Sequence, residues 1–285
     1  MNLPSNFDTD IYRNNNYDLK HMDDNEAYWH YEKYGKNEGR ICSKIINRDT
    51  LKSYINEKMN CLEIGPFDNP VVSGEKVKYF DVLDRENLIK RSIECGRISN
   101  NVPFIHYVDP NCNLSIINEK FDCVLSCHSI EHQIDLIKHL NDVSNLLYQN
   151  GCYFVICPDK RYCFDHFIKE TTIADVIDMN ENKRNNHSIK SVIEHRALTC
   201  HNDPIRHWNN DHGEYNIDFI AVKNAIDEFR NSDSYIDVHS MQFTSTSFEN
   251  IINILYSLKY IDLKIEKIYH TLRNSCEFYA VLKKY

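Results

Sequence analysis

From Cys61 onward the chain alternates short apolar runs with segments of helical periodicity, and this alternation constrains the fold more than any other feature. Short apolar runs separated by helices predict parallel strands with helices on both faces of the sheet. We expect strands at residues 61–64, 76–82, 104–108, 121–126, 152–157, 261–268 and 276–282. The sequence therefore predicts an α/β protein with a seven-stranded, Rossmann-like sheet.

Two amphipathic helices accompany the later strands. Apolar residues recur every three or four positions from Ile130 to Leu147, which predicts one long helix stopped by Gly151. The segment Thr246 to Glu249 has the pattern of a capping box and predicts the start of a second helix.

The chain divides into three parts by composition. Residues 1–45 are rich in Asn, Asp and Tyr and predict a module of two or three short helices. Residues 159–240 are rich in His, Asn and Asp and are too long for an ordinary loop, so we interpret them as an inserted lid. The main domain then comprises residues 55–158 and 241–285.

Charge and hydropathy exclude several classes of protein. The 33 Lys and Arg residues and 42 Asp and Glu residues give a net charge of −9, which argues against a nucleic-acid partner. No apolar run approaches the roughly 18 to 20 residues of a membrane span. The polar first ten residues do not resemble a secretory leader, so we expect a cytoplasmic protein whose 11 cysteines are reduced.

Acidic residues end the first two predicted strands. Glu63-Ile64-Gly65-Pro66 ends the first strand, and Asp81 ends the second. Ligands of open parallel sheets bind beyond the carboxyl ends of the strands, where an acid on the second strand can accept two ribose hydroxyls. No two of the seven glycines have the spacing of a dinucleotide fingerprint or a P-loop. A cofactor with a ribose and a cationic or zwitterionic tail therefore fits better than NAD.

Several motifs resemble those of the class I S-adenosylmethionine-dependent methyltransferases. Leu62–Pro66 resembles their first motif in its Glu-Ile-Gly-Pro branch, where a single glycine remains. Phe121–His132 resembles F-D-x-V-x-S-x-H-x-L-E-H, and Asn150–Asp165 resembles G-G-x-x-x-x-x-V-P-D-K-R-Y-x-F-D. The resemblance implies the methyltransferase form of the sheet, S-adenosyl-L-methionine as cofactor, and contacts to it from these residues: Glu63, Gly65, Pro66, Asp81, Asp109 and Ser126.

Candidate acid–base residues follow the fourth predicted strand. His128, Glu131 and His132 lie where family members place the reacting end of the cofactor, and imidazole can accept a proton at neutral pH. Packing of His132 or cofactor positioning by His128 is the alternative. His207 or His212 of the lid is the rival base.

The lid and the first module suggest the acceptor. Polar and aromatic side chains that could contact a sugar are Lys160, Arg161, Tyr162, Trp208 and His212. The histidine spacings match no known metal motif, so we expect no metal. Residues 7–40, with His30-Tyr31 and Glu38-Gly39-Arg40, resemble a small helical module found beside glycan-synthesis enzymes.

These observations predict a methyltransferase that O-methylates a sugar or nucleotide-linked sugar in glycan biosynthesis. Its partners would be a small-molecule or glycan substrate and either a glycosyltransferase or further copies of this chain. The alternatives are methylation of another small metabolite by the same fold and a non-catalytic protein that binds a ligand or a glycosyltransferase.

Overall fold

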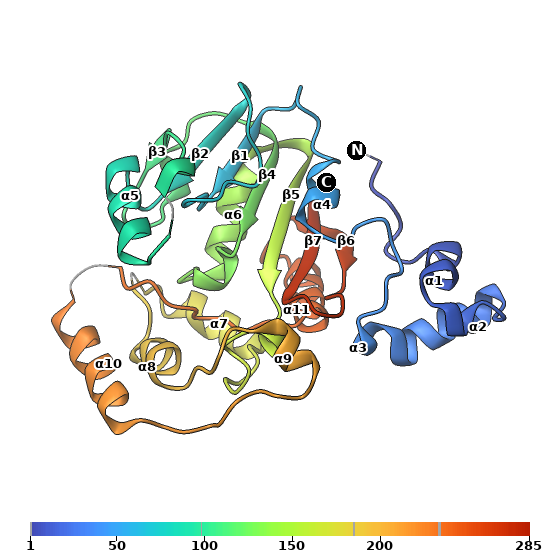
Figure 1. The fold of residues 1–285 in the computed structure, drawn as a ribbon. Helices are drawn as coiled ribbons and strands as arrows, with labels where there is room; N and C mark the ends of the chain where they lie inside the picture. Colours follow the sequence, from blue (N-terminus) through green and yellow to red (C-terminus); the bar gives the residue numbers. More distant parts are fainter. Residues whose placement is uncertain (1, 98, 185, 233–234) are drawn as a thin grey trace.

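The computed structural model describes residues 2–97, 99–184, 186–232 and 235–285, and its centre is one seven-stranded sheet (Figure 1). The strand order is β3-β2-β1-β4-β5-β7-β6, and β7 runs antiparallel to β5 and β6 whereas the other neighbouring pairs are parallel. The strands are β1 (Cys61–Ile64), β2 (Val77–Asp81), β3 (Tyr107–Val108), β4 (Phe121–Cys127), β5 (Leu147–Pro158), β6 (Leu263–Tyr269) and β7 (Glu277–Lys284). The predicted α/β, Rossmann-like seven-stranded fold is confirmed.

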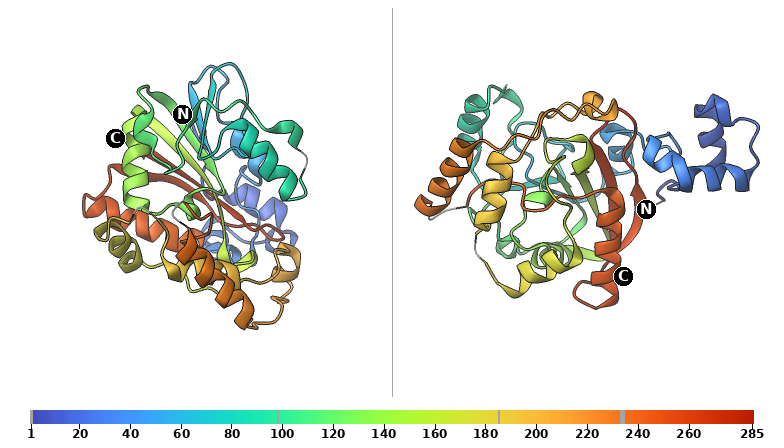
Figure 2. Two further views of the ribbon diagram at one scale, coloured as in Figure 1. Left: turned by 90° about the vertical axis from the view of Figure 1, so that its left-hand side faces the viewer. Right: turned by 90° about the horizontal axis from the view of Figure 1, so that it is seen from below.

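Alternate residues of the central strands enter two different cores. Ile64 and Val124 belong to the core beneath α6 (Leu136–Leu146) and α11 (Ser245–Ser257), which cover one face of the sheet (Figure 2). Cys61 belongs to the core on the opposite face, with Leu51 of α4 (Arg48–Lys52). This period of two explains why strands with both faces buried appear as continuous apolar runs in the sequence.

The helix predicted from Ile130 to Leu147 is wrong in its extent. The segment starts as a single turn, η5 (Ile130–His132), leaves helical geometry at Gln133, and restarts as α6 with Asp135 as its N-cap. The Asp135 side chain accepts a hydrogen bond from Lys138 N, which is the local reason for the restart. Gly151, predicted to stop the helix, lies inside β5 instead.

Two other predicted boundaries also differ. The cap of α11 is Thr244, which exchanges hydrogen bonds with Ser247, so the predicted capping box at Thr246 is two residues too late. Only Tyr107–Val108 of the predicted third strand pairs with β2, and Phe104 is exposed.

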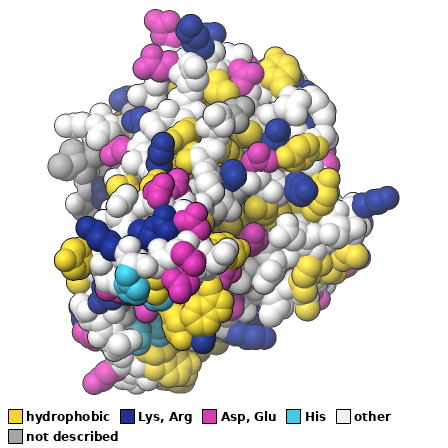
Figure 3. Space-filling model, turned by 90° about the vertical axis from the view of Figure 1, so that its right-hand side faces the viewer, with side chains coloured by type: hydrophobic (Ala, Val, Ile, Leu, Met, Phe, Trp, Pro, Cys, Tyr) yellow, Lys and Arg dark blue, Asp and Glu magenta, His cyan; other side chains and the backbone are white. Residues whose placement is uncertain are grey.

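The N-terminal helices form a small unit with its own apolar cluster of Tyr12, Leu19, Ala27, Tyr31 and Cys42. They are α1 (Thr9–Asn15), η1 (Tyr17–Leu19), α2 (Asp24–His30), η2 (Tyr31–Gly35) and α3 (Lys36–Glu38). In Figure 1 and in the right-hand view of Figure 2 this unit extends from the β6 side of the sheet. On the face shown in Figure 3, hydrophobic side chains are interspersed among acidic and basic ones.

The segment between β5 and α11 lies beyond the carboxyl ends of the strands (Figure 1). Its helices are η6 (Lys160–Tyr162), α7 (Ile173–Glu181), α8 (Ile189–Ala197), α9 (Pro204–Trp208) and α10 (Phe219–Asn231). The other helices are α5 (Arg85–Glu94), η3 (Ser99–Asn101) and η4 (Leu114–Ile116). Among the described residues, no helix has the length and apolar character needed to cross a bilayer.

Candidate active site

The turn after β1 meets the loop after β4 at the point where the strand order reverses. Gly65 has φ +68°, a left-handed conformation that side chains other than glycine's rarely adopt. A Cβ at this position would lie 3.4 Å from both Cβ and Oγ of Ser129. The backbone of the β1 turn therefore lies close to the segment that carries the candidate catalytic residues.

Glu63 supports this turn from inside the protein. Its carboxylate accepts hydrogen bonds from Val71 N at 2.8 Å and Val72 N at 3.1 Å. Burial raises the pKa of Glu63 to about 7, although these two amides oppose the shift. The structure therefore assigns Glu63 a positioning role: it holds the loop after β1 rather than presenting a free carboxylate.

Asp81 ends β2, as predicted, and is 7% exposed. Burial raises its pKa to about 6, and hydrogen bonds from the backbone amides of Leu83, Val82 and Phe67 oppose the shift. The negative charge of Asp237 adds to the increase. A ligand whose hydroxyl groups donate hydrogen bonds to Asp81 would stabilise a carboxylate that burial disfavours.

The remaining predicted cofactor residues have different surroundings. Asp109 directly follows β3 and accepts a hydrogen bond from Asn111 N. Pro66 is buried in the turn after β1. Ser126 is fully buried, and its Oγ lies 2.7 Å from the hydroxyl of Tyr153, so its side chain faces the core.

Three of the four predicted catalytic residues meet beyond β4. Glu131 is 1% exposed, and neither of its carboxylate oxygens has a hydrogen-bond partner among the described residues. Its Oε1 atom lies 3.8 Å from Nδ1 of His128 and 4.0 Å from Nε2 of His132. These distances exceed those of hydrogen bonds.

A third histidine, His239, joins this group from the segment that precedes α11. Its Nε2 lies 3.7 Å from Oε1 of Glu131, and its ring packs edge-on against His132. Ser240 N and Met241 N both donate to Glu131 O, which fixes this segment beside η5. The side chains of Glu131, His132 and His239 therefore form one cluster, although His239 is distant from the other two in sequence.

A carboxylate lies close to one ring nitrogen of each of the three histidines, His128, His132 and His239. His132 Nδ1 lies 2.9 Å from Asp237, and His239 Nδ1 lies 2.6 Å from Asp165. His128 Nε2 lies 2.7 Å from Glu277, which Arg48 also contacts. Although burial opposes ionisation, His128 and Arg48 lower the pKa of Glu277 to about 2.

Sequence reasoning missed His239 and the carboxylates Asp165, Asp237 and Glu277. The sequence could have indicated Asp165, because this residue ends the P-D-K-R-Y-x-F-D motif. His239 lies at the end of the predicted insertion, and its isolated position gave no ligand spacing.

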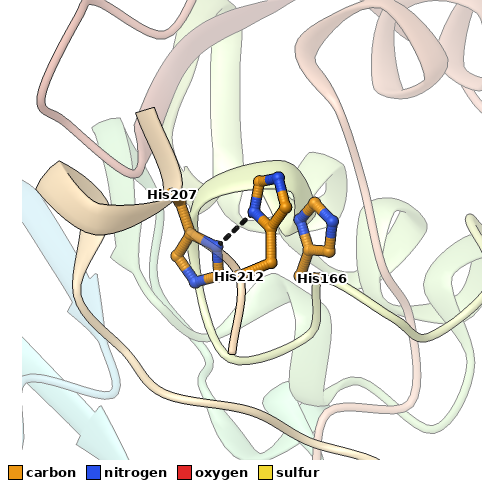
Figure 4. A group of neighbouring side chains, drawn as sticks. All are labelled: His166, His207 and His212. Carbon is orange, nitrogen blue, oxygen red and sulfur yellow. Dashed lines mark hydrogen bonds between the residues drawn. The ribbon is translucent and has the colours of Figure 1, made fainter. Parts of the chain in front are cut away.

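The lid histidines His207 and His212 form a different group with His166 (Figure 4). Nδ1 of His207 lies 3.0 Å from Nδ1 of His212, and the rings of His166 and His212 stack with centroids 3.7 Å apart. Burial lowers the pKa of His207 to about 4. The structure thus does not place His207 with His128, Glu131 and His132.

The predicted acceptor residues largely contact one another and the protein interior. Arg161 makes two hydrogen bonds to buried Asp159, and Lys160 donates to His166 O. The rings of Tyr162 and Trp208 stack with centroids 3.9 Å apart, and Trp208 Nε1 donates to Ser275 O. This arrangement anchors the insertion beside β7 and leaves less aromatic surface for a sugar than the sequence suggested.

A pocket of about 700 Å³ opens beside the histidine cluster. Its lining includes His132 and Gln133, the loop Asn111–Asn113 after β3, and Tyr235. Most of its lining residues are of polar types, and Asp135 and Lys138 supply both signs of charge. Gly65 and Asp81 are not among the lining residues.

No protein-family model matches the chain, and no curated protein matches it either. Among solved structures, it is similar to an S-adenosylmethionine-dependent methyltransferase from Clostridium acetobutylicum, with 12% identity over 91% of this chain and 98% of the other and a TM-score of 0.42. A SAM-dependent methyltransferase from Aquifex aeolicus gives 9% identity, coverage of 85% and 92%, and a TM-score of 0.41. Mitomycin 7-O-methyltransferase is 10% identical over 94% of this chain and 60% of the other, with a TM-score of 0.40.

Proposed function

We propose that this chain is an S-adenosylmethionine-dependent methyltransferase that methylates a hydroxyl group of a sugar or nucleotide-linked sugar. One observation carries the proposal: the left-handed turn at Gly65, the acid Asp81 and the Glu131–His132 cluster gather at one edge of a sheet with the predicted topology. Ligands of such sheets bind beyond this edge, where the strand order reverses.

The residues at this edge fit the cofactor. Gly65 allows the close approach of a ligand to the backbone, and Asp81 has the position and chemistry to accept the ribose hydroxyls. Asp109 follows β3 at the side where an adenine would lie. When bound, S-adenosylmethionine supplies an electrophilic methyl group on a sulfonium. Because Asp81 is almost buried, we expect the loop after β1 to adjust when the ribose enters.

His132 is the side chain best placed to take the proton of an acceptor hydroxyl. Asp237 lies 2.9 Å from Nδ1, at ion-pair distance but without a hydrogen bond, and we assign the accepting role to Nε2. Burial lowers the pKa of His132, but the ion pair with Asp237 and the charge of Glu131 raise it more, and the net shift is upward. The imidazolium formed during the reaction is therefore stabilised by the residues around it.

Two features support a hydroxyl-rich acceptor. The pocket beside His132 offers amide, carboxylate and ammonium groups from Asn111, Gln133, Asp135 and Lys138. The N-terminal helical unit has the sequence pattern of modules found beside glycan-synthesis enzymes. On this basis we infer a cytoplasmic role in glycan biosynthesis, with a glycosyltransferase or a second copy of this chain as partner.

Mass spectrometry of the purified protein for bound S-adenosylmethionine or its demethylated product tests the cofactor, and calorimetry with both compounds quantifies it. Asp81→Ala should weaken binding, because each charge-assisted hydrogen bond to the ribose contributes about 1.5 to 3 kcal/mol. Asp262→Ala, an exposed acid just before β6, is the matched control.

Incubation with nucleotide sugars and cofactor then tests the acceptor. Mass spectra should show the gain of one methyl group, and His132→Ala should prevent it. Cofactor binding without transfer to any sugar would favour another small metabolite, whereas binding of neither compound would favour the non-catalytic alternative.

A further inference from the structure

The geometry points to a divalent transition-metal site formed by Glu131, His132 and His239, beyond the carboxyl end of β4. The three side chains present one carboxylate oxygen and two imidazole nitrogens that all lie within 4.8 Å of one another. This donor set is common in zinc and non-haem iron sites, whereas magnesium and calcium prefer oxygen ligands. Nothing in the sequence spacing indicates it, because His239 lies far from the other two residues along the chain.

Buried Glu131 is the first observation that requires a missing partner. It is 1% exposed, and both of its oxygens lack hydrogen-bond partners among the described residues. Leaving an ionised carboxylate unpaired inside a protein is strongly unfavourable. A cation beside Oε1 would remove this penalty.

The orientation of the two imidazoles is the second observation. Asp237 lies 2.9 Å from Nδ1 of His132, and Asp165 lies 2.6 Å from Nδ1 of His239. Asp165 can accept the Nδ1 proton of His239 and leave the lone pair on Nε2, as in most histidine ligands of metals, whereas Nδ1 of His132 lies at ion-pair distance from Asp237 without a hydrogen bond. In both rings it is Nε2 that faces Oε1 of Glu131.

The distances suit a shared ion better than direct contact. Nε2 of His239 lies 3.7 Å and Nε2 of His132 lies 4.0 Å from Oε1 of Glu131. Two ligand atoms at about 2.0 to 2.2 Å from one zinc ion are about 3.4 Å apart in tetrahedral geometry, so movements of about 0.3 to 0.6 Å would close the site. Nδ1 of His128, 3.8 Å from the same oxygen, is placed to approach the ion as a further ligand.

The local charge is also suitable. Glu131, Asp165 and Asp237 bring three carboxylates to this cluster, and Arg91 pairs with one of them, Asp237. A divalent ion would balance the remaining two. The lid group of His166, His207 and His212 is less suited, because His207 and His212 already contact each other through Nδ1 and His166 Nδ1 contacts Arg161 O.

Zinc binding to the full chain tests this inference. Protein stripped of metal with a chelator and dialysed should bind one equivalent of Zn²⁺ by calorimetry, in the absence of cofactor and acceptor. Glu131→Gln and His239→Ala should weaken binding by more than about 100-fold. Asp165→Asn, which removes only the carboxylate behind His239, should weaken it by about 10- to 100-fold.

His166→Ala is the matched control, because it removes a histidine from the competing lid group, and it should bind zinc like the wild type. Absence of zinc binding, or its loss in His166→Ala but not in His239→Ala, would overturn the inference. Circular dichroism confirms the fold of each variant, and partly exposed His132→Ala replaces any variant that does not fold.

The metal site and the cofactor site fail separately, but zinc and the proton of an acceptor would both need Nε2 of His132, so zinc binding there would contradict the assignment of His132 as the base. Zinc binding is measured without cofactor, so a protein that binds S-adenosylmethionine but no zinc contradicts only the metal site. A protein that binds zinc but no S-adenosylmethionine contradicts only the proposed function.

Discussion

Replacing Asp81 by Asn should stabilise the protein at high pH while it weakens cofactor binding. Burial raises the pKa of Asp81 from 3.8 to about 6, so the folded state holds a proton that the unfolded state releases. The stability contributed by this proton is fully present below about pH 4 and is lost as the pH rises through about 6. Asparagine does not titrate and avoids the loss.

The magnitude follows from the shift. A change of about two pKa units corresponds to about 3 kcal/mol of unfolding free energy, of which about 2 kcal/mol develops between about pH 4.5 and about pH 8. Urea unfolding at both pH values should therefore show that the free energy of unfolding of Asp81→Asn, relative to that of the wild type, increases by about 2 kcal/mol from the lower to the higher pH. Because only the change with pH is compared, a constant difference between the Asp and Asn side chains does not matter.

Asp262→Asn is the control, because the side chain of Asp262 is exposed rather than buried. A wild-type-to-variant difference that stays constant between the two pH values would refute the reasoning, because it would show that the folded protein does not disfavour the Asp81 carboxylate. Calorimetry on the same samples should show weaker S-adenosylmethionine binding by the more stable variant.

Three further outcomes are expected. Gly65→Ala should cost about 1 to 2 kcal/mol of stability, measured by urea unfolding, because of its φ of +68°, and should weaken cofactor binding; unchanged affinity would remove the turn from the site. Deletion of residues 1–43 should leave a cooperatively melting domain by circular dichroism, since Cys42 belongs to the N-terminal cluster and Ile45 to the sheet core; an insoluble product would contradict this. His132→Ala should lower turnover by about 10² to 10⁴-fold with nearly unchanged cofactor affinity, and loss of turnover only in His207→Ala would place the base in the insertion instead.

Much of the sheet could be predicted because its strands are buried on both faces. Continuous apolar runs such as Cys152–Cys157 leave little alternative to a central strand. The edge strand β3 was harder, because only Tyr107 and Val108 pair with β2 and the preceding Phe104 is exposed. Helix periodicity also continued through Gln133, where the capping preference of Asp135 restarts the helix.

The candidate site was predictable only where its residues follow one strand. His128, Glu131 and His132 are close in sequence and therefore remain close in the fold. The contribution of His239 depends on where the chain returns after the insertion, which no local pattern encodes. Conversely, Lys160 and Arg161 had the chemistry of acceptor contacts, but internal partners at His166 and Asp159 already occupy them.

The path of residues 235–243 has a consequence for how such a protein can diversify. This segment contacts α5 through the ion pair of Asp237 with Arg91, the η5 turn through Ser240, and Thr171 through Gln242. Although this segment ends the insertion in the sequence, these contacts fix it to elements on the main domain and at the start of the insertion. Exchanging the helices between Ile173 and Asn231 for others would change the walls of the pocket beside His132 and keep the Glu131–His239 pair, provided that the new segment re-enters at residue 235.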